Sequence, residues 1–244
     1  KHLPNWRKVT DMRAAILPKF GGPNVFEVND VPAPQPAPDQ MLVKVSACGV
    51  CGHDLLNRAG HFPHTQPPPV TGHKIPGVVV EAGPLVRQFK VGDRVAVIQR
   101  IPCGVCQACR SGQESICVSG PGFYGEGISG GYGEFVIASD RNAVLLPESI
   151  PLHIGSVLSC AIGTGYHALR RGEFKLGDTV LITGASGGVG IHAVKLAALM
   201  GLRVIAISGS PGKQDRLLDA GASDVVVTSD YNFHGDVREM TQGR

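Results

Sequence analysis

Four cysteines near the middle of the chain have the spacing of a metal site. Cys103, Cys106, Cys109 and Cys117 follow the pattern C-x2-C-x2-C-x7-C. Four thiolates this close together can fold one short loop, at about 100–118, around a tetrahedral zinc ion that keeps no open position for a substrate. A disulfide pair or a chance cluster is the alternative, but cysteines separated by two residues bridge with difficulty. The pattern therefore predicts a structural zinc site.

A glycine-rich segment in the second half of the chain has the pattern of a phosphate-binding loop. It reads Gly184-Ala185-Ser186-Gly187-Gly188-Val189-Gly190 and follows the apolar run Thr179 to Thr183. At a strand-to-helix junction, glycines let the backbone approach a pyrophosphate, and the helix N-terminus supplies free N–H donors. A tight turn whose glycines serve packing alone is the alternative. The context favours dinucleotide binding by Gly184, Ser186, Gly187, Gly188, Val189 and Gly190.

The segment after the next expected strand indicates which dinucleotide would bind. An acidic residue at this position accepts hydrogen bonds from the adenosine ribose and repels a 2′-phosphate. This chain instead has Ser208-Gly209-Ser210, followed by Lys213 and Arg216. Hydroxyl groups with nearby cations favour a phosphate, so NADP(H) is expected in preference to NAD(H). Two cations that merely face water at a helix start are the alternative.

Composition describes an ordinary globular chain. The 244 residues are 18% charged and 43% hydrophobic, with a formal net charge of +3, so neither a nucleic-acid partner nor a membrane partner is expected. The 33 glycines and 18 prolines predict many tight turns between short strands. Seven cysteines are an odd number, and no secretory signal opens the chain. A reducing cytoplasm is the expected location.

The first part of the chain predicts a small β structure. Short strands are expected at Arg13–Leu17, Val25–Val28, Met41–Ala47, Gly77–Glu81, Arg94–Ile98 and Glu134–Ala138. The proline-rich stretches Val31–Pro38 and Pro67–Pro69 are expected to be extended connections, because proline lacks a backbone donor. Residues 1–11 are treated as an extension without a role. A compact β barrel or sandwich follows from this pattern.

After Pro151 the pattern predicts alternating helices and strands. Leu152 to Arg171 is expected to be helical, with an interruption at Gly163-Thr164-Gly165. Strands are expected at Thr179–Thr183, Arg203–Ile207 and Val225–Thr228, and helices at Val189–Met200 and Lys213–Ala220. This β-α-β-α-β order is half of a doubly wound dinucleotide fold.

The end of the sequence suggests that this fold continues further. Gly235 to Arg244 has the pattern of the start of another helix. With only half of the doubly wound sheet, Val180 to Ile182 would form an unpaired apolar edge, which favours aggregation. We therefore expect the chain to be incomplete and residues 1–244 alone to behave poorly in solution.

Several of these motifs together resemble one family. In chain order they are Gly49-Val50-Cys51-Gly52-His53-Asp54, Gly72-His73, Val91-Gly92-Asp93-Arg94-Val95, the four-cysteine loop, Cys160 with Thr164-Gly165-Tyr166, and the glycine loop. From Met12 to Arg244 the chain is similar to the medium-chain dehydrogenase/reductases, in particular to the zinc-dependent alcohol dehydrogenases. The resemblance implies an α/β plus β fold: a GroES-like β-barrel catalytic domain over 12–160, then a partial Rossmann domain over 161–244.

The resemblance also implies a second, catalytic zinc site. Spacing alone does not connect its ligands, and singly Cys160 resembles a core residue and His73 a turn histidine. By analogy with the family, Cys51, His73 and Cys160 hold the ion and leave the fourth position for water or substrate. Asp54 is expected to orient His73. The nicotinamide is expected against Val189 and Thr164.

Three positions depart from the family pattern. His53 stands where many relatives have a hydroxyl residue that passes the alcohol proton towards solvent, so His53 is a candidate acid/base. Lys74 stands where relatives usually have glutamate, and its positive charge is expected to favour a bound anion. Ala185 stands where alcohol dehydrogenases often have glycine, a form that resembles the quinone-reductase branch.

The expected function is a zinc- and NADP(H)-dependent interconversion of a small alcohol and an aldehyde or ketone. Two alternatives remain at this point. One is a zinc-independent quinone or enone reductase, although those relatives generally lack both cysteine sets. The other is a truncated, non-catalytic protein that binds zinc and a nucleotide. A full-length protein of this family would be a homodimer or homotetramer.

Overall fold

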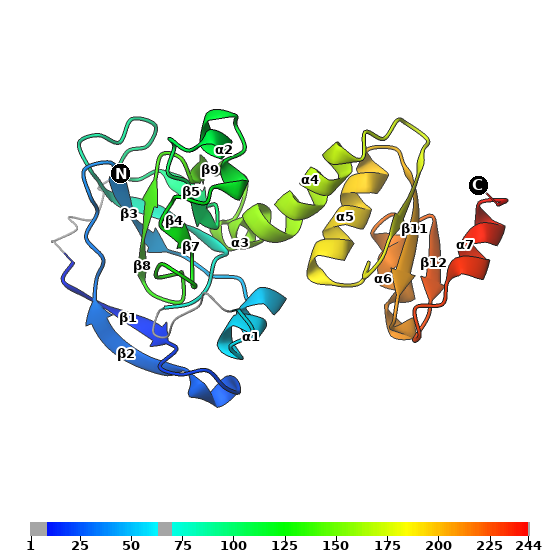
Figure 1. Cartoon of the computed structure of the whole chain (residues 1–244), viewed down its shortest axis with the longest axis horizontal. Coiled ribbons are helices and arrows are strands. Elements are labelled where there is room, and N and C mark those ends of the chain that lie inside the picture. Colours follow the sequence, from blue (N-terminus) through cyan, green and yellow to red (C-terminus); the bar gives the residue numbers. More distant parts are fainter. Residues whose placement is uncertain (1–8, 63–69, 244) are drawn as a thin grey trace. The chain divides into compact units, whose positions relative to one another are not determined.

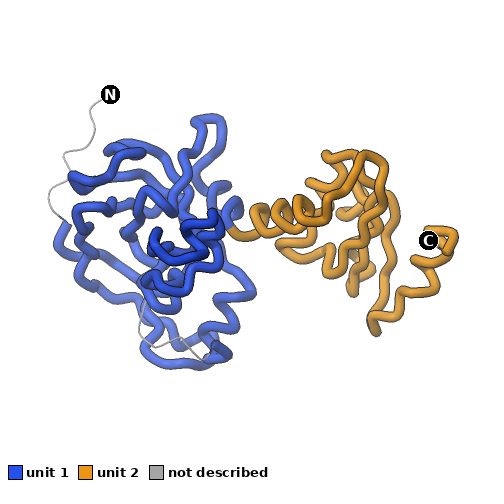
Figure 2. The backbone as a smooth tube through the Cα atoms, turned by 45° about the horizontal axis from the view of Figure 1, so that its top comes forward, with its two compact units in different colours: residues 1–159 blue, residues 160–244 orange. Residues whose placement is uncertain are grey.

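The computed structural model describes residues 9–62 and 70–243 and divides the chain into two compact units, Lys1–Ser159 and Cys160–Arg244 (Figure 2). Pro67–Pro69 and most of the expected extension therefore lie outside the described residues. Within the described part, no helix has the length and apolar character needed to cross a membrane.

The first unit consists mainly of short antiparallel strands (Figure 1). Its strands are β1 (Asp11–Ile16), β2 (Glu27–Pro32), β3 (Gln40–Val45), β4 (Ile75–Ala82), β5 (Arg94–Val97), β6 (Arg100–Ile101), β7 (Gly122–Phe123), β8 (Phe135–Ser139) and β9 (Ala143–Leu145). Its α-helices are α1 (Gly52–Arg58), α2 (Gln107–Arg110) and α3 (Gly155–Val157), and 3-10 turns occupy Pro23–Val25, Glu114–Ile116 and Leu152–Ile154.

A five-stranded sheet with the order β8-β3-β4-β5-β9 forms the centre of this unit. All of its neighbouring pairs are antiparallel. Alternation along β3 to β5 directs one set of side chains inward, where Met41, Val43, Val79, Val95 and Val97 are each fully buried. This packing fixes the sheet from which the loops with the functional residues project.

The structure corrects the expected second strand. Val25 lies in a 3-10 turn that begins at Pro23, and β2 begins only at Glu27. Val31 and Pro32 belong to β2 rather than to the expected extended connection, because β2 pairs antiparallel with β1 up to the pair Asp11–Pro32. Proline is tolerated there because it is the last residue of the strand and β2 pairs with β1 alone.

The second unit is a parallel α/β structure. It contains α4 (Gly163–Arg171), β10 (Thr179–Ile182), α5 (Gly188–Leu199), β11 (Arg203–Ser208), a 3-10 turn at Pro211–Lys213, α6 (Gln214–Asp219), β12 (Asp224–Val227) and α7 (His234–Met240). The sheet has the order β10-β11-β12, and both of its pairs are parallel. In the described part β10 therefore lies at an edge of this sheet, with Leu181 40% exposed.

The helical segment before β10 also differs from expectation. The predicted interruption at Gly163-Thr164-Gly165 is wrong, because these residues form the first turn of α4. A Cβ at Gly165 would lie 3.2 Å from the Cβ of Ala193, so this glycine serves close packing of α4 on α5. The irregularity falls one turn earlier, in a π-helix over Leu158–Ile162. Such turns are often found at functional sites.

Candidate functional site

The four clustered cysteines form a compact sulfur cage. Their Sγ atoms all lie within 4.8 Å of one another. Two of the separations, Cys103–Cys109 and Cys106–Cys117, are 3.9 Å. A tetrahedral zinc ion with sulfur ligands at about 2.3 Å requires about 3.8 Å between sulfurs, whereas a disulfide requires about 2.05 Å. The cage therefore fits a zinc ion and not a pair of disulfides.

Backbone and side-chain donors prepare this cage for a metal. The backbone N–H of Cys103 donates to Sγ of Cys117 at 3.2 Å, and that of Cys106 donates to Sγ of Cys103 at 3.3 Å. The bond from Cys103 lowers the pKa of Cys117 to about 6, so that its thiolate forms readily. Arg100 donates from Nη1 to the carbonyl of Cys117 at 2.9 Å. These contacts attach the cage to the end of β6.

A second cluster unites three residues that lie far apart in the sequence. Cys51, His73 and Cys160 place their ligand atoms within 4.8 Å of one another. Cys51 is the N-cap of α1, His73 precedes β4, and Cys160 lies in the π-helix. Two thiols and one imidazole, with no fourth ligand from residues 9–62 and 70–243, are the donor set of a catalytic zinc site.

Asp54 connects two of these three residues. Its Oδ2 accepts a hydrogen bond from the backbone N–H of Cys51 at 2.8 Å and completes the capping box of α1. Its Oδ1 lies 3.2 Å from Nδ1 of His73, and both side chains are almost completely buried. The carboxylate thereby orients the imidazole so that Nε2 remains for a metal. The local fold of α1 and the expected role of Asp54 thus depend on the same carboxylate.

The glycine before His73 is required by the backbone. Gly72 has a φ of +92°, and a Cβ there would lie 2.7 Å from the ring of Tyr132 and 2.8 Å from Sγ of Cys48. A side chain at this position would therefore displace two half-buried neighbours as well as strain the turn. The Gly-His motif consequently has a steric cause in this structure.

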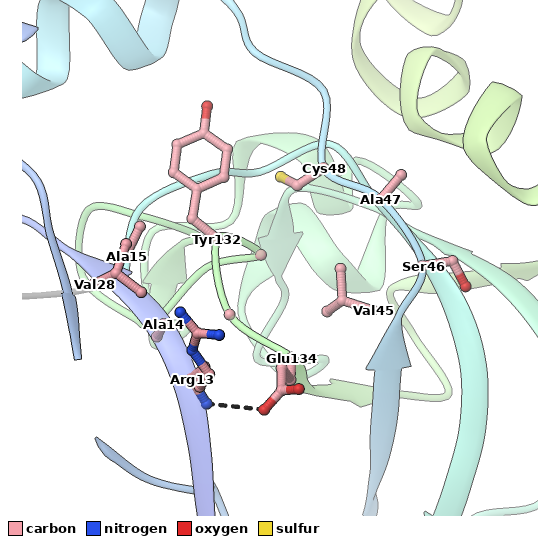
Figure 3. Close-up of a pocket in the computed structure, with 12 residues that line it drawn as sticks. Arg13, Ala14, Ala15, Val28, Val45, Ser46, Ala47, Cys48, Tyr132 and Glu134 are labelled. Carbon is pink, nitrogen blue, oxygen red and sulfur yellow. Dashed lines mark hydrogen bonds between the residues drawn. The ribbon is translucent and has the colours of Figure 1, made fainter. Parts of the chain in front are cut away.

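Cys48 does not belong to the metal cluster, although it lies only three residues before Cys51. Burial raises the pKa of its thiol to about 12, so it stays protonated. Together with Tyr132, Arg13 and Glu134 it lines a pocket of about 510 Å³ in the first unit (Figure 3). None of the three metal-cluster residues lines this pocket, so it is distinct from the candidate metal site.

His53 lies beside the metal cluster and has an acidic partner. Its Nε2 is 2.5 Å from Oε1 of Glu126, and its ring lies at 5.0 Å from the ring of His73. Phe62 stacks on the His53 ring at 4.4 Å, and Phe123 packs against both histidines. The two aromatic rings and the Glu126 carboxylate thus enclose His53 next to the metal ligands.

Glu126 and the two phenylalanines are functional candidates that sequence reasoning missed. Glu126 is 73 residues from His53 and lies in the turn after β7, where no spacing rule connects it with α1. A short segment rich in aromatic residues and glycine, Gly122-Phe123-Tyr124-Gly125-Glu126, was the available signal. Only the fold reveals which residues it approaches.

Lys74 also lies at this cluster and is only 6% exposed. Burial acts to raise the pKa of Cys51, but the backbone N–H of His53, the positive charge of Lys74 and the contact with His73 outweigh it and lower that pKa below its usual value. Thiolate formation at Cys51 is therefore favoured.

The glycine loop joins β10 to α5 as expected, but its glycines have different roles. Gly184 has a φ of +60°, and a Cβ at Gly190 would lie 2.3 Å from the carbonyl oxygen of Gly184. These two glycines are needed by the fold itself. Gly188, the first residue of α5, has open space where a Cβ would stand. Gly188 thus leaves a free approach to the helix N-terminus, as a pyrophosphate requires.

The residues expected to recognise the adenosine ribose of the cofactor differ in exposure, because one is buried and another faces solvent. Ser208 is buried at the end of β11, and its hydroxyl group is bonded to Ser186 Oγ at 3.1 Å and to the backbone N–H of Ser210 at 3.2 Å. It therefore shapes the loop rather than facing solvent. Lys213 is exposed and lines a pocket of about 230 Å³. The other lining residues are Ser186, Gly187, Gly188, Ile191, Arg216 and Leu217.

Thr164 and Val189 both reach the surface of the second unit. Thr164 is exposed in the first turn of α4, and Val189 is 39% exposed in the first turn of α5. An exposed valine at a helix start is available to contact a flat ring. Their expected contact with a nicotinamide remains a prediction.

Comparison with known proteins agrees with this geometry. Residues 37–148 match the alcohol dehydrogenase GroES-like domain, and residues 188–244 match the zinc-binding dehydrogenase family. The acryloyl-coenzyme A reductase of Metallosphaera sedula is 35% identical to this chain. The match covers 91% of this chain and 65% of the relative. The chain thus spans slightly less than two thirds of that relative.

Two further proteins resemble most of the chain. The NAD-dependent alcohol dehydrogenase of Sulfolobus acidocaldarius is 35% identical over 96% of this chain and 68% of its own length. The crystal structure of AibC superimposes with a TM-score of 0.92 at 42% identity, covering 100% of this chain and 68% of AibC. The fold, the two metal-ligand clusters and these matches together show that the chain belongs to the zinc-dependent alcohol dehydrogenase family of medium-chain dehydrogenase/reductases.

Proposed function

We propose that the full-length protein is a zinc-dependent oxidoreductase that transfers a hydride between NADP(H) and the oxygen-bearing carbon of a small alcohol, aldehyde or ketone. The observation that supports this most is the cluster of Cys51, His73 and Cys160, whose ligand atoms lie within 4.8 Å of one another. A zinc ion held there supplies a Lewis acid that polarises the substrate oxygen. The presence of this cluster and of the four-cysteine cage argues against the zinc-independent reductase.

The residues around the cluster support distinct roles in this reaction. Asp54 holds His73 through Nδ1 at 3.2 Å and keeps the ligand oriented. His53 and Glu126, 2.5 Å apart, offer a path for the proton that leaves an alcohol or enters a carbonyl. Phe62 and Phe123 pack on His53 and reduce its contact with water. The reaction balances as alcohol plus oxidised cofactor giving carbonyl, reduced cofactor and one proton.

The second unit supports dinucleotide binding through its glycine loop. Gly187, Gly188 and the N-terminus of α5 would receive the pyrophosphate, and the nicotinamide would lie against Thr164 and Val189. Lys213 and Arg216 line one pocket with Ser186, which favours a 2′-phosphate and hence NADP(H). The relative from Sulfolobus acidocaldarius is named for NAD, so the preference needs a direct measurement.

A second candidate reaction is reduction of a carbon–carbon double bond conjugated to a thioester. It is favoured by the name of the Metallosphaera sedula relative, an acryloyl-coenzyme A reductase at 35% identity. Chemically the two reactions are close, because hydride addition to either substrate places negative charge on an oxygen. In the second candidate, hydride adds to the double-bond carbon farther from the thioester, and the negative charge develops on the thioester oxygen. A proton then adds to the carbon next to the thioester and completes the reduction.

Steady-state assays of the zinc-loaded full-length protein test the proposal. We expect oxidation of NADPH at 340 nm with aldehydes or ketones, faster than with NADH. Turnover of acryloyl-coenzyme A without turnover of carbonyl compounds would favour the second candidate. Cofactor binding with no turnover of either class would favour the non-catalytic alternative.

We further propose that the first unit is the catalytic domain and the second the cofactor domain of a homodimer or homotetramer. All seven cysteines are free thiols, which suits a reducing compartment such as the cytoplasm. Separate expression of 12–160 and 161–244 followed by metal analysis and cofactor titration would test this division.

A further inference from the structure

Lys74 has an unusual environment for a lysine. It follows His73 directly and is only 6% exposed, although lysine side chains almost never lie in protein interiors without a partner. Its carbonyl accepts a hydrogen bond from the backbone N–H of Gly49 at 3.1 Å. A Cβ at Gly49 would lie 3.3 Å from Cβ and 3.2 Å from Cδ of Lys74. The aliphatic part of Lys74 thus packs closely against the Gly49 backbone, which leads to Cys51.

The ammonium group of Lys74 has no carboxylate partner among the described residues. Within 9–62 and 70–243 no aspartate or glutamate lies in ion-pair distance of it. Residues 1–8 and 63–69 contain neither aspartate nor glutamate. Gly49, against which the Lys74 side chain packs, instead lies between Cys48 and the metal-cluster residue Cys51. A charge on a side chain this little exposed is costly unless a compensating charge is near, and the thiolates of the adjacent metal site can supply it.

The formal charge of the metal site shows why the sign of the charge on residue 74 matters. A divalent ion is neutralised by the thiolates of Cys51 and Cys160, and the buried carboxylate of Asp54 then leaves one negative charge. Lys74 cancels that charge, whereas a glutamate at the same position would add a second negative charge. A neutral site accepts an anionic oxygen much more readily than a doubly negative one.

We infer that Lys74 is a specificity-determining residue that selects for negative charge on the substrate oxygen at the Cys51–His73–Cys160 site. This inference deepens the proposed function and rests on it. The alkoxide of an alcohol and the enolate of a conjugated thioester both have this chemistry, so Lys74 would serve either candidate reaction. Its role is electrostatic and requires no proton transfer by Lys74.

Ligand binding to the cobalt-substituted full-length protein tests the inference without turnover. Acetate and acetamide have nearly the same shape, but only acetate is charged, and both can be titrated through the visible absorption of cobalt. We expect Lys74→Met to raise the dissociation constant of acetate about tenfold or more. That of acetamide should change less than about twofold, because no net charge is involved. Lys74→Arg, which keeps the charge, should bind acetate nearly as tightly as the unaltered protein.

Several outcomes would overturn the inference. Equal weakening of both probes in Lys74→Met would indicate a packing role, and an unchanged affinity for acetate would indicate no role. Failure of acetate to bind the unaltered cobalt protein would also overturn it. Retention of metal at the four-cysteine cage and an unchanged thermal midpoint establish that each variant is folded. Failure of the proposed function is distinguishable, because it would appear as absence of turnover while the difference between the two probes persists.

Discussion

His53 and Glu126 form a short contact between two segments that are distant in sequence. Nε2 of His53 lies 2.5 Å from Oε1 of Glu126, with both side chains partly exposed. The His53 ring is also stacked on Phe62 at 4.4 Å with an interplanar angle of 23°. Helix α1, which contains Asp54 as well, is therefore connected to the turn after β7 at the point nearest to the metal ligands. Glu126 thus fixes the orientation of the His53 imidazole.

Replacement of Glu126 by glutamine should separate orientation from charge. Glu126→Gln keeps the size and an oxygen acceptor, but it removes the negative charge that stabilises a protonated His53. We expect kcat to fall about tenfold or more, with KM changed less than about twofold, as for loss of an acid/base partner. The measurement is steady-state kinetics of the full-length enzyme. Glu81→Gln, at an exposed position of β4, is the matched control, and equal kinetics of the two variants would refute a role for Glu126.

The four-cysteine cage should hold its own zinc ion. Cys117 is 1% exposed and accepts the Cys103 N–H, so Cys117→Ser removes a sulfur ligand and leaves a smaller, weakly metal-binding oxygen in its buried place. We expect loss of one of two zinc ions per chain and a decrease of the thermal midpoint by about 4 °C or more. Metal analysis and calorimetry measure the two effects. Cys48→Ser should keep both ions, because Cys48 belongs to neither cluster; two ions in Cys117→Ser would contradict the assignment.

Two glycines of the cofactor loop provide a matched pair. Gly190→Ala would place a Cβ 2.3 Å from the Gly184 carbonyl oxygen, so it should destabilise the fold by about 1–3 kcal/mol. Gly188→Ala has space, and its stability should change by less than about 0.5 kcal/mol. Its cofactor affinity should nevertheless fall about tenfold, because the methyl group blocks the approach to the helix N-terminus. Chemical denaturation and cofactor titration test both, and unimpaired binding by Gly188→Ala would contradict the pyrophosphate position.

Lys213 and Arg216 should determine the preference for NADP(H). The double variant Lys213→Ala, Arg216→Ala should reduce kcat/KM for NADPH by about 10-fold to 100-fold at low salt and leave that for NADH nearly unchanged. The loss should diminish at high ionic strength, because these exposed charges are screened. A proportional loss with both cofactors would instead indicate a general effect on α6. Lys195→Ala, on the neighbouring helix α5, serves as the control.

Sites whose residues lie close together in the sequence could be predicted from their spacing. Sites whose residues are distant in the sequence and come together only in the folded chain could not. The cage at Cys103 to Cys117 lies within one loop, so its spacing alone predicts the geometry that the structure has. The parallel order β10, α5, β11 was equally predictable, because apolar runs alternate with helical patterns. The Cys51, His73 and Cys160 cluster required the family resemblance, because more than 100 positions separate its first and last members.

The failures have specific physical causes. Glycines at 163–165 suggested a break in the helix, but they instead permit contact between α4 and α5. The contact of His53 with Glu126 depends on a loop whose path no local rule predicts. Ser208 is buried and bonded to Ser186 and Ser210, because hydroxyl groups readily satisfy neighbouring backbone groups, and its expected contact with a cofactor stays a prediction.

The π-helix at Leu158–Ile162 determines the direction in which the Cys160 side chain points relative to helix α4, which follows it. Each residue of an α-helix advances about 100°, so removal of one residue from this turn would swing the Cys160 thiol by about that angle relative to α4. Helix α4 cannot rotate to compensate, because Gly165 is in close contact with Ala193. The wide π-helical turn therefore sets the direction of the Cys160 side chain, and a chain with one residue fewer here would point the Cys160 sulfur away from Cys51 and His73.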